Sequence, residues 1–273
     1  MINQSIDYIL EHLNENITVK NVAGHFHFSE FYFSRVFKAE TGESVYAFMK
    51  RLKMDQSAID MKLKDSKSIT DIGLDYGYSA SNYSSAFKKH HSVSPVEFRK
   101  SVNKERVLNP FNPEKIAFFE TYEDYAARIK IEEIADVRVI YERTIGDYYE
   151  LKEKWIRFME TYKDYFNTDT VLIERFYDDP SIASPNNCIC DLCISADKEI
   201  YVSDNVTTIK GGRFATYRFE GRIADIFCTL QGIFRVWLPK SGYEMDERYG
   251  LNIYRKINLN DDFVVMDLCI PIK

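Results

Sequence analysis

Several features are scarce or missing in this sequence of 273 residues. No stretch approaches the roughly 18–20 uninterrupted apolar residues that a membrane span needs, so we expect no membrane insertion. The first thirteen residues mix Asp7, Glu11 and His12 with apolar residues and lack a basic-then-apolar leader, which argues against secretion. The five cysteines are an odd number and fit reduced thiols better than a disulfide scaffold. Together these absences predict a cytoplasmic protein.

Motifs for the common chemistries are also missing. The sequence contains no phosphate-binding glycine loop and no GxSxG nucleophile motif. Cys188, Cys190 and Cys193 are close together, but on one strand Cys193 points away from the other two, and no histidine follows His91 to complete a zinc set. The pair of His90 and His91 at a helix end is interpreted as solvated or facing phosphate. We therefore expect no catalytic residue, no metal site and no cofactor.

Charge is divided unevenly along the chain. Residues 1–106 contain 15 basic and 13 acidic residues, whereas the remainder contains 21 basic and 29 acidic residues. Only the first part is suited to a polyanion. Between them, Asn109-Pro110-Phe111-Asn112-Pro113 disfavours a helix and indicates a connection. The sequence predicts an all-α domain over residues 1–106, a linker over 107–114 and a second domain over 115–273.

The first domain contains an internal repeat. A shift of 50 residues aligns Phe33-Ser34 with Tyr83-Ser84, and Phe37-Lys38 with Phe87-Lys88. Each copy predicts a short helix, a tight turn and a second helix, because its apolar residues recur at helical spacing. The expected helices cover residues 18–25 and 29–40 in the first copy and 68–75 and 79–90 in the second, with a long joining helix over 44–63.

The second helix of each copy presents polar and aromatic side chains away from its apolar face. Such a face suits a major groove, where arginine can bind guanine and lysine can pair with phosphate. In the simpler alternative, a helical bundle has solvated charged faces, but a solvated face needs no duplication. The candidate DNA-binding residues are Phe31, Ser34, Arg35, Lys38, Ser81, Asn82, Ser85, Lys88 and Lys89.

Residues 1–102 resemble the AraC/XylS-type DNA-binding domain of bacterial transcription regulators. The resemblance depends on the run from Phe33 to Lys38, on Tyr76-Gly77-Tyr78 and on the closing run from Ser94 to Arg99. It implies two helix-turn-helix units that read DNA through their second helices. Two turn positions depart from the usual glycine, at His27 and Ser92, and the second reading helix is rich in serine. We expect Arg35 and Phe31 to dominate base discrimination, while the second unit mainly holds phosphates.

The second domain contains another internal similarity, at a shift of 75 residues. Strand patterns over 138–145 and 213–220 each end at a glycine and are followed by helix patterns over 148–165 and 223–238. Further strands are expected over 126–131, 171–177, 188–195, 251–254 and 263–270. Many strands and two main helices predict an α+β domain with a mainly antiparallel sheet. Two related halves predict a pseudo-twofold axis with a ligand crevice between them.

This domain resembles the GyrI-like effector-binding family. The matching motifs include Val139–Arg143, Cys190–Ile194, Lys210–Ala215 and Trp237–Tyr243. The resemblance implies an aromatic crevice that binds small amphipathic, often cationic, molecules. The candidate effector-binding residues are Tyr141, Tyr149, Trp155, Trp237, Asn252 and Tyr254.

Asn252 stands where many of these domains have a glutamate two residues before a tyrosine. An amide supplies no formal charge. We expect a neutral or weakly polar ligand, or a cation whose charge is countered elsewhere, for instance by Glu142.

The two resemblances together imply a one-component regulator with a Rob-like architecture. Its expected partners are double-stranded DNA, a small amphipathic effector and RNA polymerase. One alternative is a GyrI-like enzyme that hydrolyses reactive small molecules, although Asn252 weakens it. Another is a protein that sequesters drugs and binds DNA only secondarily. Salt-dependent, sequence-selective DNA binding distinguishes the regulator from both.

Overall fold

The computed structural model describes residues 1–64, 66–102, 107–109, 112–117, 119–146, 150–196, 205–258 and 262–273. The chain divides into two compact units, Met1–Lys104 and Glu105–Lys273, and each is described here by itself. In the described part of the chain, no helix combines the length and the apolar character needed to cross a membrane.

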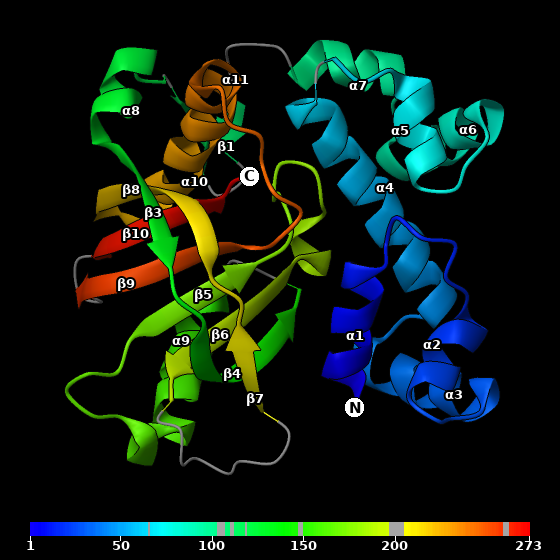
Figure 1. Ribbon diagram of the computed structural model, residues 1–273, viewed down its shortest axis with the longest axis horizontal. Coiled ribbons are helices and arrows are strands. Elements are labelled where there is room, and N and C mark those ends of the chain that lie inside the picture. Colours follow the sequence, from blue (N-terminus) through cyan, green and yellow to red (C-terminus); the bar gives the residue numbers. More distant parts are fainter. Residues whose placement is uncertain are drawn as a thin grey trace. The chain divides into compact units, whose positions relative to one another are not determined.

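The first unit is all-α, as predicted. Its described helices are α1 (Ile2–Glu11), α2 (Val19–His25), α3 (Glu30–Thr41), α4 (Val45–Leu63), α5 (Ile69–Asp75), α6 (Ala80–His91) and α7 (Pro95–Val102). The long helix α4 connects the α2–α3 pair to the α5–α6 pair (Figure 1). The repeat inferred from the sequence is therefore a repeat of structure, and its helix bounds agree within one or two residues.

Local chemistry fixes where these helices begin and turn. Ser94 and Glu97 form a reciprocal capping box at the start of α7, as their spacing predicts. Gly42 ends α3 with a φ of 79°, and Ser92, its counterpart in the second copy, ends α6 with a φ of 64°. His27 adopts a φ of 60° where the second copy has a glycine. The two departures from the turn glycine thus keep the left-handed conformation at a steric cost.

The core of the first unit lies between the helix pairs and α4. Phe37 packs edge-on against Phe48 of α4, with ring centroids 5.2 Å apart. In the second copy, Tyr83 is fully buried and its hydroxyl donates a 2.9 Å hydrogen bond to Ser57 of α4. These contacts orient α3 and α6 so that their opposite faces remain exposed.

The second unit has the predicted α+β architecture. Its described strands are β1 (Val107–Asn109), β2 (Asn112–Ala117), β3 (Ile129–Ile134), β4 (Val137–Ile145), β5 (Leu172–Phe176), β6 (Ile189–Ser195), β7 (Val206–Ile209), β8 (Gly212–Arg222), β9 (Gly250–Asn258) and β10 (Phe263–Pro271). Its helical segments are α8 (Tyr122–Arg128), α9 (Leu151–Thr161), η2 (Lys163–Tyr165), η3 (Pro185–Asn187), α10 (Ile223–Gly232), η4 (Ile233–Trp237) and α11 (Leu238–Ser241).

Eight of these strands form one antiparallel sheet in the order β3-β8-β10-β9-β5-β6-β4-β7. Outward from the central β5–β9 pair, one side has β6, β4 and β7, and the other has β10, β8 and β3. Strand β3 precedes β4 in the chain but pairs with β8, while β7 precedes β8 but pairs with β4. The halves are related as the 75-residue shift predicts, and they exchange their outermost strands.

A buried aspartate bound by two arginines repeats in the two halves, although the arginines of the second cluster are about half exposed. Asp191 on β6 accepts hydrogen bonds from Arg143 on β4 and Arg175 on β5, with a 2.8 Å distance to Nε of each arginine. Asp267 on β10 is bound in the same way by Arg218 on β8 and by a further arginine on β9. Because the aspartate lies on the strand between its arginines, each cluster links three strands.

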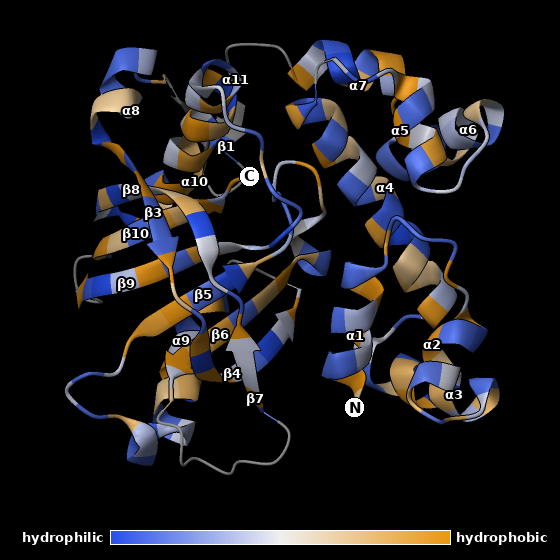
Figure 2. Ribbon diagram, in the orientation of Figure 1, coloured by the Kyte–Doolittle hydropathy of each residue, from blue (hydrophilic) through white to orange (hydrophobic). Residues whose placement is uncertain are grey.

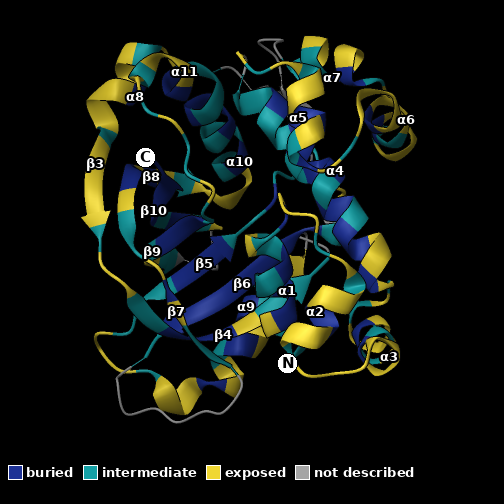
Figure 3. Ribbon diagram, turned by 45° about the vertical axis from the view of Figure 1, so that its right-hand side comes forward, coloured by how far each residue is buried: buried dark blue, intermediate teal, exposed yellow. Residues whose placement is uncertain are grey.

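The sheet buries residues on both faces. Hydrophobic residues are concentrated along its inner strands (Figure 2). Strands β5 and β6 are buried, whereas the outermost strand β3 is exposed (Figure 3). One face contains Ile140, Cys190 and Leu192 beneath α9, and the other contains Tyr141 and Cys193. As predicted, Cys190 and Cys193 point in opposite directions.

Some elements differ from the prediction. Residues 126–128 end helix α8 instead of beginning a strand, and β7 was not predicted. Part of the expected linker over 107–114 is paired, because β1 and β2 form a short antiparallel pair. Prolines prevent a helix there but are tolerated where a strand leaves a donor position unused. The expected helix over 223–238 contains a π-helical turn at Ile233–Trp237.

Candidate functional site

The first reading helix, α3, exposes the face that the sequence selected. Phe31 is 80% exposed, and Arg35 and Lys38 are also exposed, whereas Ser34 is half-buried. The guanidinium of Arg35 lies 5.8 Å from the ring centre of Tyr32, which holds the side chain along the helix. An exposed phenylalanine beside two cations leaves an apolar and cationic surface available to a groove.

The second reading helix, α6, also presents its predicted residues to solvent. The exposed residues are Ser81, Asn82, Ser85, Lys88 and Lys89. The opposite face is fixed by Tyr83 and Phe87, which are fully buried. The structure therefore places all nine candidate DNA-binding residues on the outward faces of α3 and α6, with Ser34 at the edge of its face.

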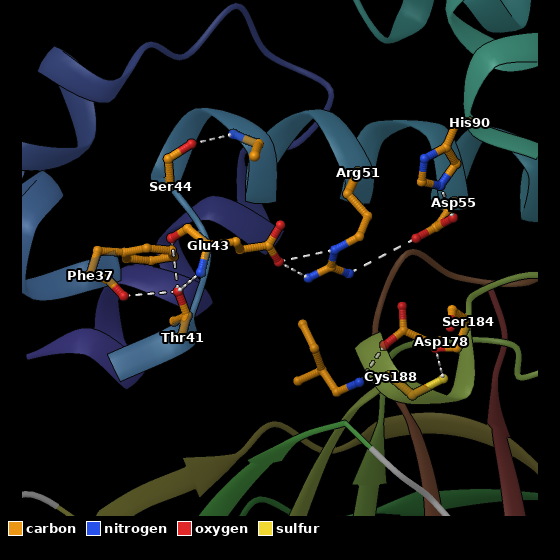
Figure 4. A network of polar contacts seen from close by, with 12 residues as sticks. Phe37, Thr41, Glu43, Ser44, Arg51, Asp55, His90, Asp178, Ser184 and Cys188 are labelled. Atoms are coloured by element: carbon orange, nitrogen blue, oxygen red, sulfur yellow. Dashed lines mark hydrogen bonds and ion pairs between the residues drawn. The ribbon is translucent and has the colours of Figure 1, made fainter. Parts of the chain in front are cut away.

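A line of polar side chains runs along α4 between the ends of the two reading helices (Figure 4). Glu43, just after α3, accepts hydrogen bonds from Arg51 at 2.6 and 3.1 Å. Arg51 Nη1 lies 4.0 Å from Asp55 Oδ2, and Asp55 Oδ1 lies 2.7 Å from His90 Nε2 at the end of α6. We refer to these four residues as the α4 polar line.

A buried carboxylate lies at the centre of the second unit. Glu174 on β5 is 4% exposed. Its Oε1 accepts hydrogen bonds from Trp155 Nε1 at 2.8 Å and from the Tyr254 hydroxyl at 2.5 Å, and its Oε2 accepts one from Asn252 Nδ2 at 2.9 Å. Three of the six candidate effector residues therefore converge on one carboxylate.

The electrostatics of this Glu174 cluster favour a positively charged partner. All three donors are neutral, and among the described residues no lysine or arginine pairs with Glu174. Burial and the neighbouring carboxylate raise the pKa of Tyr254 well above its usual value, so the phenol remains a donor. Asn252 Oδ1 is buried and accepts no hydrogen bond from the described residues. The cluster thus has both uncompensated negative charge and an unused acceptor.

The remaining candidate effector residues lie elsewhere. Tyr141 belongs to the opposite face of the sheet, where it contacts the guanidinium groups of Arg143 and Arg175. Trp237, in the π-helical turn, stacks on Tyr243 at 6.1 Å. Tyr141 is separated from the Glu174 cluster because side chains alternate across a strand. Trp237 is not among the described residues that pack around Trp155. Tyr149 lies outside the described residues.

Glu174 was not among the residues predicted from the sequence. The expected counter-charge was Glu142, which is exposed on β4, because Asn252 carries no charge. Glu174 is paired with Asn252 in the register of β5 and β9, and it precedes Phe176 by two residues, as Asn252 precedes Tyr254. The 78-residue separation of Glu174 and Asn252 differs from the 75-residue shift, so aligning the halves at one shift conceals their equivalence.

The fold and these sites define a two-domain protein in which a double helix-turn-helix unit precedes a pseudo-symmetric ligand-binding fold. The chain belongs to the family of the GyrI-like small molecule binding domain, which matches residues 127–273. Residues 22–101 match a helix-turn-helix domain. Both resemblances drawn from the sequence are confirmed, and so is the Rob-like architecture.

Two transcription regulators are similar in sequence to about a third of the chain. The chain is 32% identical over 91 residues to the transcriptional regulator Rob of Salmonella typhimurium, covering 33% of this chain and 31% of Rob. It is 30% identical over 101 residues to the regulatory protein PocR of the same organism, covering 37% of this chain and 33% of PocR. The match thus spans about a third of these curated relatives.

A solved structure resembles the chain more extensively but more distantly. An EcmrR–DNA complex determined by cryo-electron microscopy aligns with 89% of this chain and 82% of its own, at 12% identity and a TM-score of 0.45.

Proposed function

We propose that this protein is a transcription regulator that reads double-stranded DNA with α3 and α6 and responds to a small amphipathic cation bound at Glu174. The observation that carries the proposal is the exposure of eight of the nine candidate DNA-binding residues on two repeated helices. The relatives named as transcription regulators support it. We also propose that the protein acts in the cytoplasm and that the effect of ligand binding is transmitted to RNA polymerase beside the bound DNA.

The DNA-binding part is tested by selecting genomic fragments that the purified protein retains. Arg35→Ala should weaken binding to a selected fragment by about 1–3 kcal/mol and change random DNA little. Lys38→Ala, three residues further along α3, is the matched control for a phosphate contact. It should weaken both DNAs alike and lower the salt slope by about 1. Equal losses on both DNAs for Arg35→Ala would contradict base reading by this residue.

The effector part of the proposal specifies a protonated amine carrying an aromatic or aliphatic body. Its positive charge pairs with the uncompensated carboxylate of Glu174, and its N–H donates a hydrogen bond to the unused Oδ1 of Asn252. Its apolar body packs beside Trp155. A permanently charged cation without an N–H satisfies only the first of these groups. We therefore expect an amine to bind more tightly than its N-trimethyl analogue, and a neutral alcohol of the same shape to bind weakly.

Tryptophan fluorescence measures this binding. A phenylalkylamine, its N-trimethyl analogue and the corresponding alcohol should be titrated into full-length protein carrying Trp237→Phe, so that Trp155 reports alone. Glu174→Gln should weaken amine binding at least about tenfold, because hydrogen bonds to a charged group contribute about 1.5–3 kcal/mol. Glu142→Gln is the control at an exposed glutamate. Equal affinities for the amine and the alcohol would refute the cation site.

A further inference from the structure

Three metal-ligating side chains meet where α6 ends against α4. Asp55 Oδ1 lies 2.7 Å from His90 Nε2 and 3.9 Å from His91 Nε2 (Figure 4 shows the Asp55–His90 contact). One donor atom from each residue lies within 4.8 Å of the others. The side chain of Asp55 is 2% exposed, that of His91 is 7% exposed and that of His90 is 30% exposed. The group is therefore buried on one side and open on the other.

A second observation shows that this group is incomplete. Asp55 Oδ2 is buried and accepts no hydrogen bond from the part of the chain that the structure describes. Arg51 Nη1 lies 4.0 Å from Oδ2, and the Nε and Nη2 atoms of Arg51 bind Glu43. Buried carboxylate oxygens in folded proteins normally have a partner. An ion coordinated by both oxygens of this carboxylate would supply one.

The chemistry of the donors suits a transition metal. Two imidazoles and one carboxylate form a common set for divalent zinc and its neighbours, with metal–nitrogen distances of about 2.0–2.1 Å and metal–oxygen distances of about 2.0–2.2 Å. A neutral imidazole nitrogen is the form of histidine that coordinates such an ion. His91 Nε2 lies 3.2 Å from the carbonyl oxygen of Met54. That contact must be exchanged for the metal.

We propose that Asp55, His90 and His91 form a binding site for a divalent transition-metal ion of the zinc type. The ion ties the last turn of α6 to α4, and water completes its coordination on the exposed side of His90. The site belongs to the second repeat alone, because the positions 50 residues earlier are Ser5, Glu40 and Thr41, which offer no imidazole. The proposal does not depend on the function proposed above, since it concerns only these donors.

The test uses full-length protein freed of metal and titrated with Zn²⁺ in competition with a chromogenic chelator. We expect one ion per chain. His90→Gln removes a donor that is partly exposed and should weaken zinc at least about 100-fold, beyond the 10–100-fold typical of losing a mere outer partner of a metal site. His27→Asn is the matched control, because His27 is an exposed histidine of the first repeat and asparagine accepts its left-handed backbone. It should leave the affinity unchanged.

A Co²⁺ spectrum makes the result independent of the variants. Nitrogen and oxygen donors give weak visible bands, whereas any of the five thiols would add strong thiolate charge transfer. Bands without thiolate absorption that vanish on adding zinc support the site, even if His90→Gln unfolds. Failure of the wild type to bind zinc, an unchanged affinity in folded His90→Gln, or a thiolate band would each overturn the proposal.

Discussion

At Gly73, in the middle of α5, an added methyl group would have two opposing effects on the stability of the first unit. A Cβ at this position would lie 2.8–3.0 Å from three carbon atoms of the Tyr83 side chain, closer than carbon atoms normally approach. The ring cannot retreat easily, because it is fully buried and its hydroxyl is bonded to Ser57. The first repeat has Ala23 and Phe33 at the matching positions.

The expected change in the free energy of unfolding follows from these two opposing effects. Replacing a helical glycine by alanine gains about 1 kcal/mol of helix propensity. Inserting a methyl into a packed core costs about 1–3 kcal/mol. Gly73→Ala should therefore destabilise the first unit by about 1 kcal/mol. Gly24→Ala is the matched control in α2, because a Cβ there meets no atom within 4 Å, and it should stabilise by up to about 1 kcal/mol.

The assay exploits the placement of both tryptophans in the second unit. Urea unfolding followed by far-ultraviolet circular dichroism reports mainly the helical unit, whereas tryptophan fluorescence reports the other unit. Gly73→Ala should lower the urea midpoint measured by circular dichroism and leave the midpoint measured by tryptophan fluorescence unchanged. If Gly73→Ala raised the helical midpoint as Gly24→Ala does, the close approach to Tyr83 would be refuted.

Two further predictions concern buried polar groups. Asp191→Asn leaves Arg143 and Arg175 without their shared charge and should destabilise the second unit by about 3–5 kcal/mol, measured by tryptophan fluorescence in urea; a loss below about 1 kcal/mol would show that the cluster is not needed. Burial raises the pKa of Tyr83 to about 12, so its protonated form stabilises the fold. This stability is fully present below pH 10 and is lost as the pH rises through about 12. The helical circular dichroism of Tyr83→Phe should therefore depend less on pH over that interval, and an unchanged alkaline transition would contradict the assignment.

Much of the fold could be predicted because its signals are local or repeated. Helical spacing and capping residues located α2 through α7, and alternation located most inner strands. The strand β7 was not predicted, because its four residues are too few to show a clear alternation of apolar and polar side chains. Helix α8 was not predicted, and its last residues were assigned to a strand because Ala126 and Ala127 suit either element. Only the capping box formed by Thr121 and Asp124 marks where the helix begins.

The candidate sites were predictable to different degrees. Outward helix faces follow directly from periodicity, so the exposure of Arg35 and Lys38 could be predicted. The Glu174 cluster depends on the register of β5 against β9, which connects residues 78 positions apart and is set by packing across the whole sheet. Likewise, Asp55 met His90 only because α6 crosses α4, and neither residue's neighbours in the sequence indicate that contact.

The exchange of β3 and β7 has a consequence for how the ligand-binding fold arose and how it assembles. Each half contributes the outermost strand to the other half's side of the sheet. Neither half is therefore complete until both have been synthesised. A fragment ending before β8 would leave β3 without the strand with which it pairs among the described residues. We therefore expect the two halves to fold as one cooperative unit.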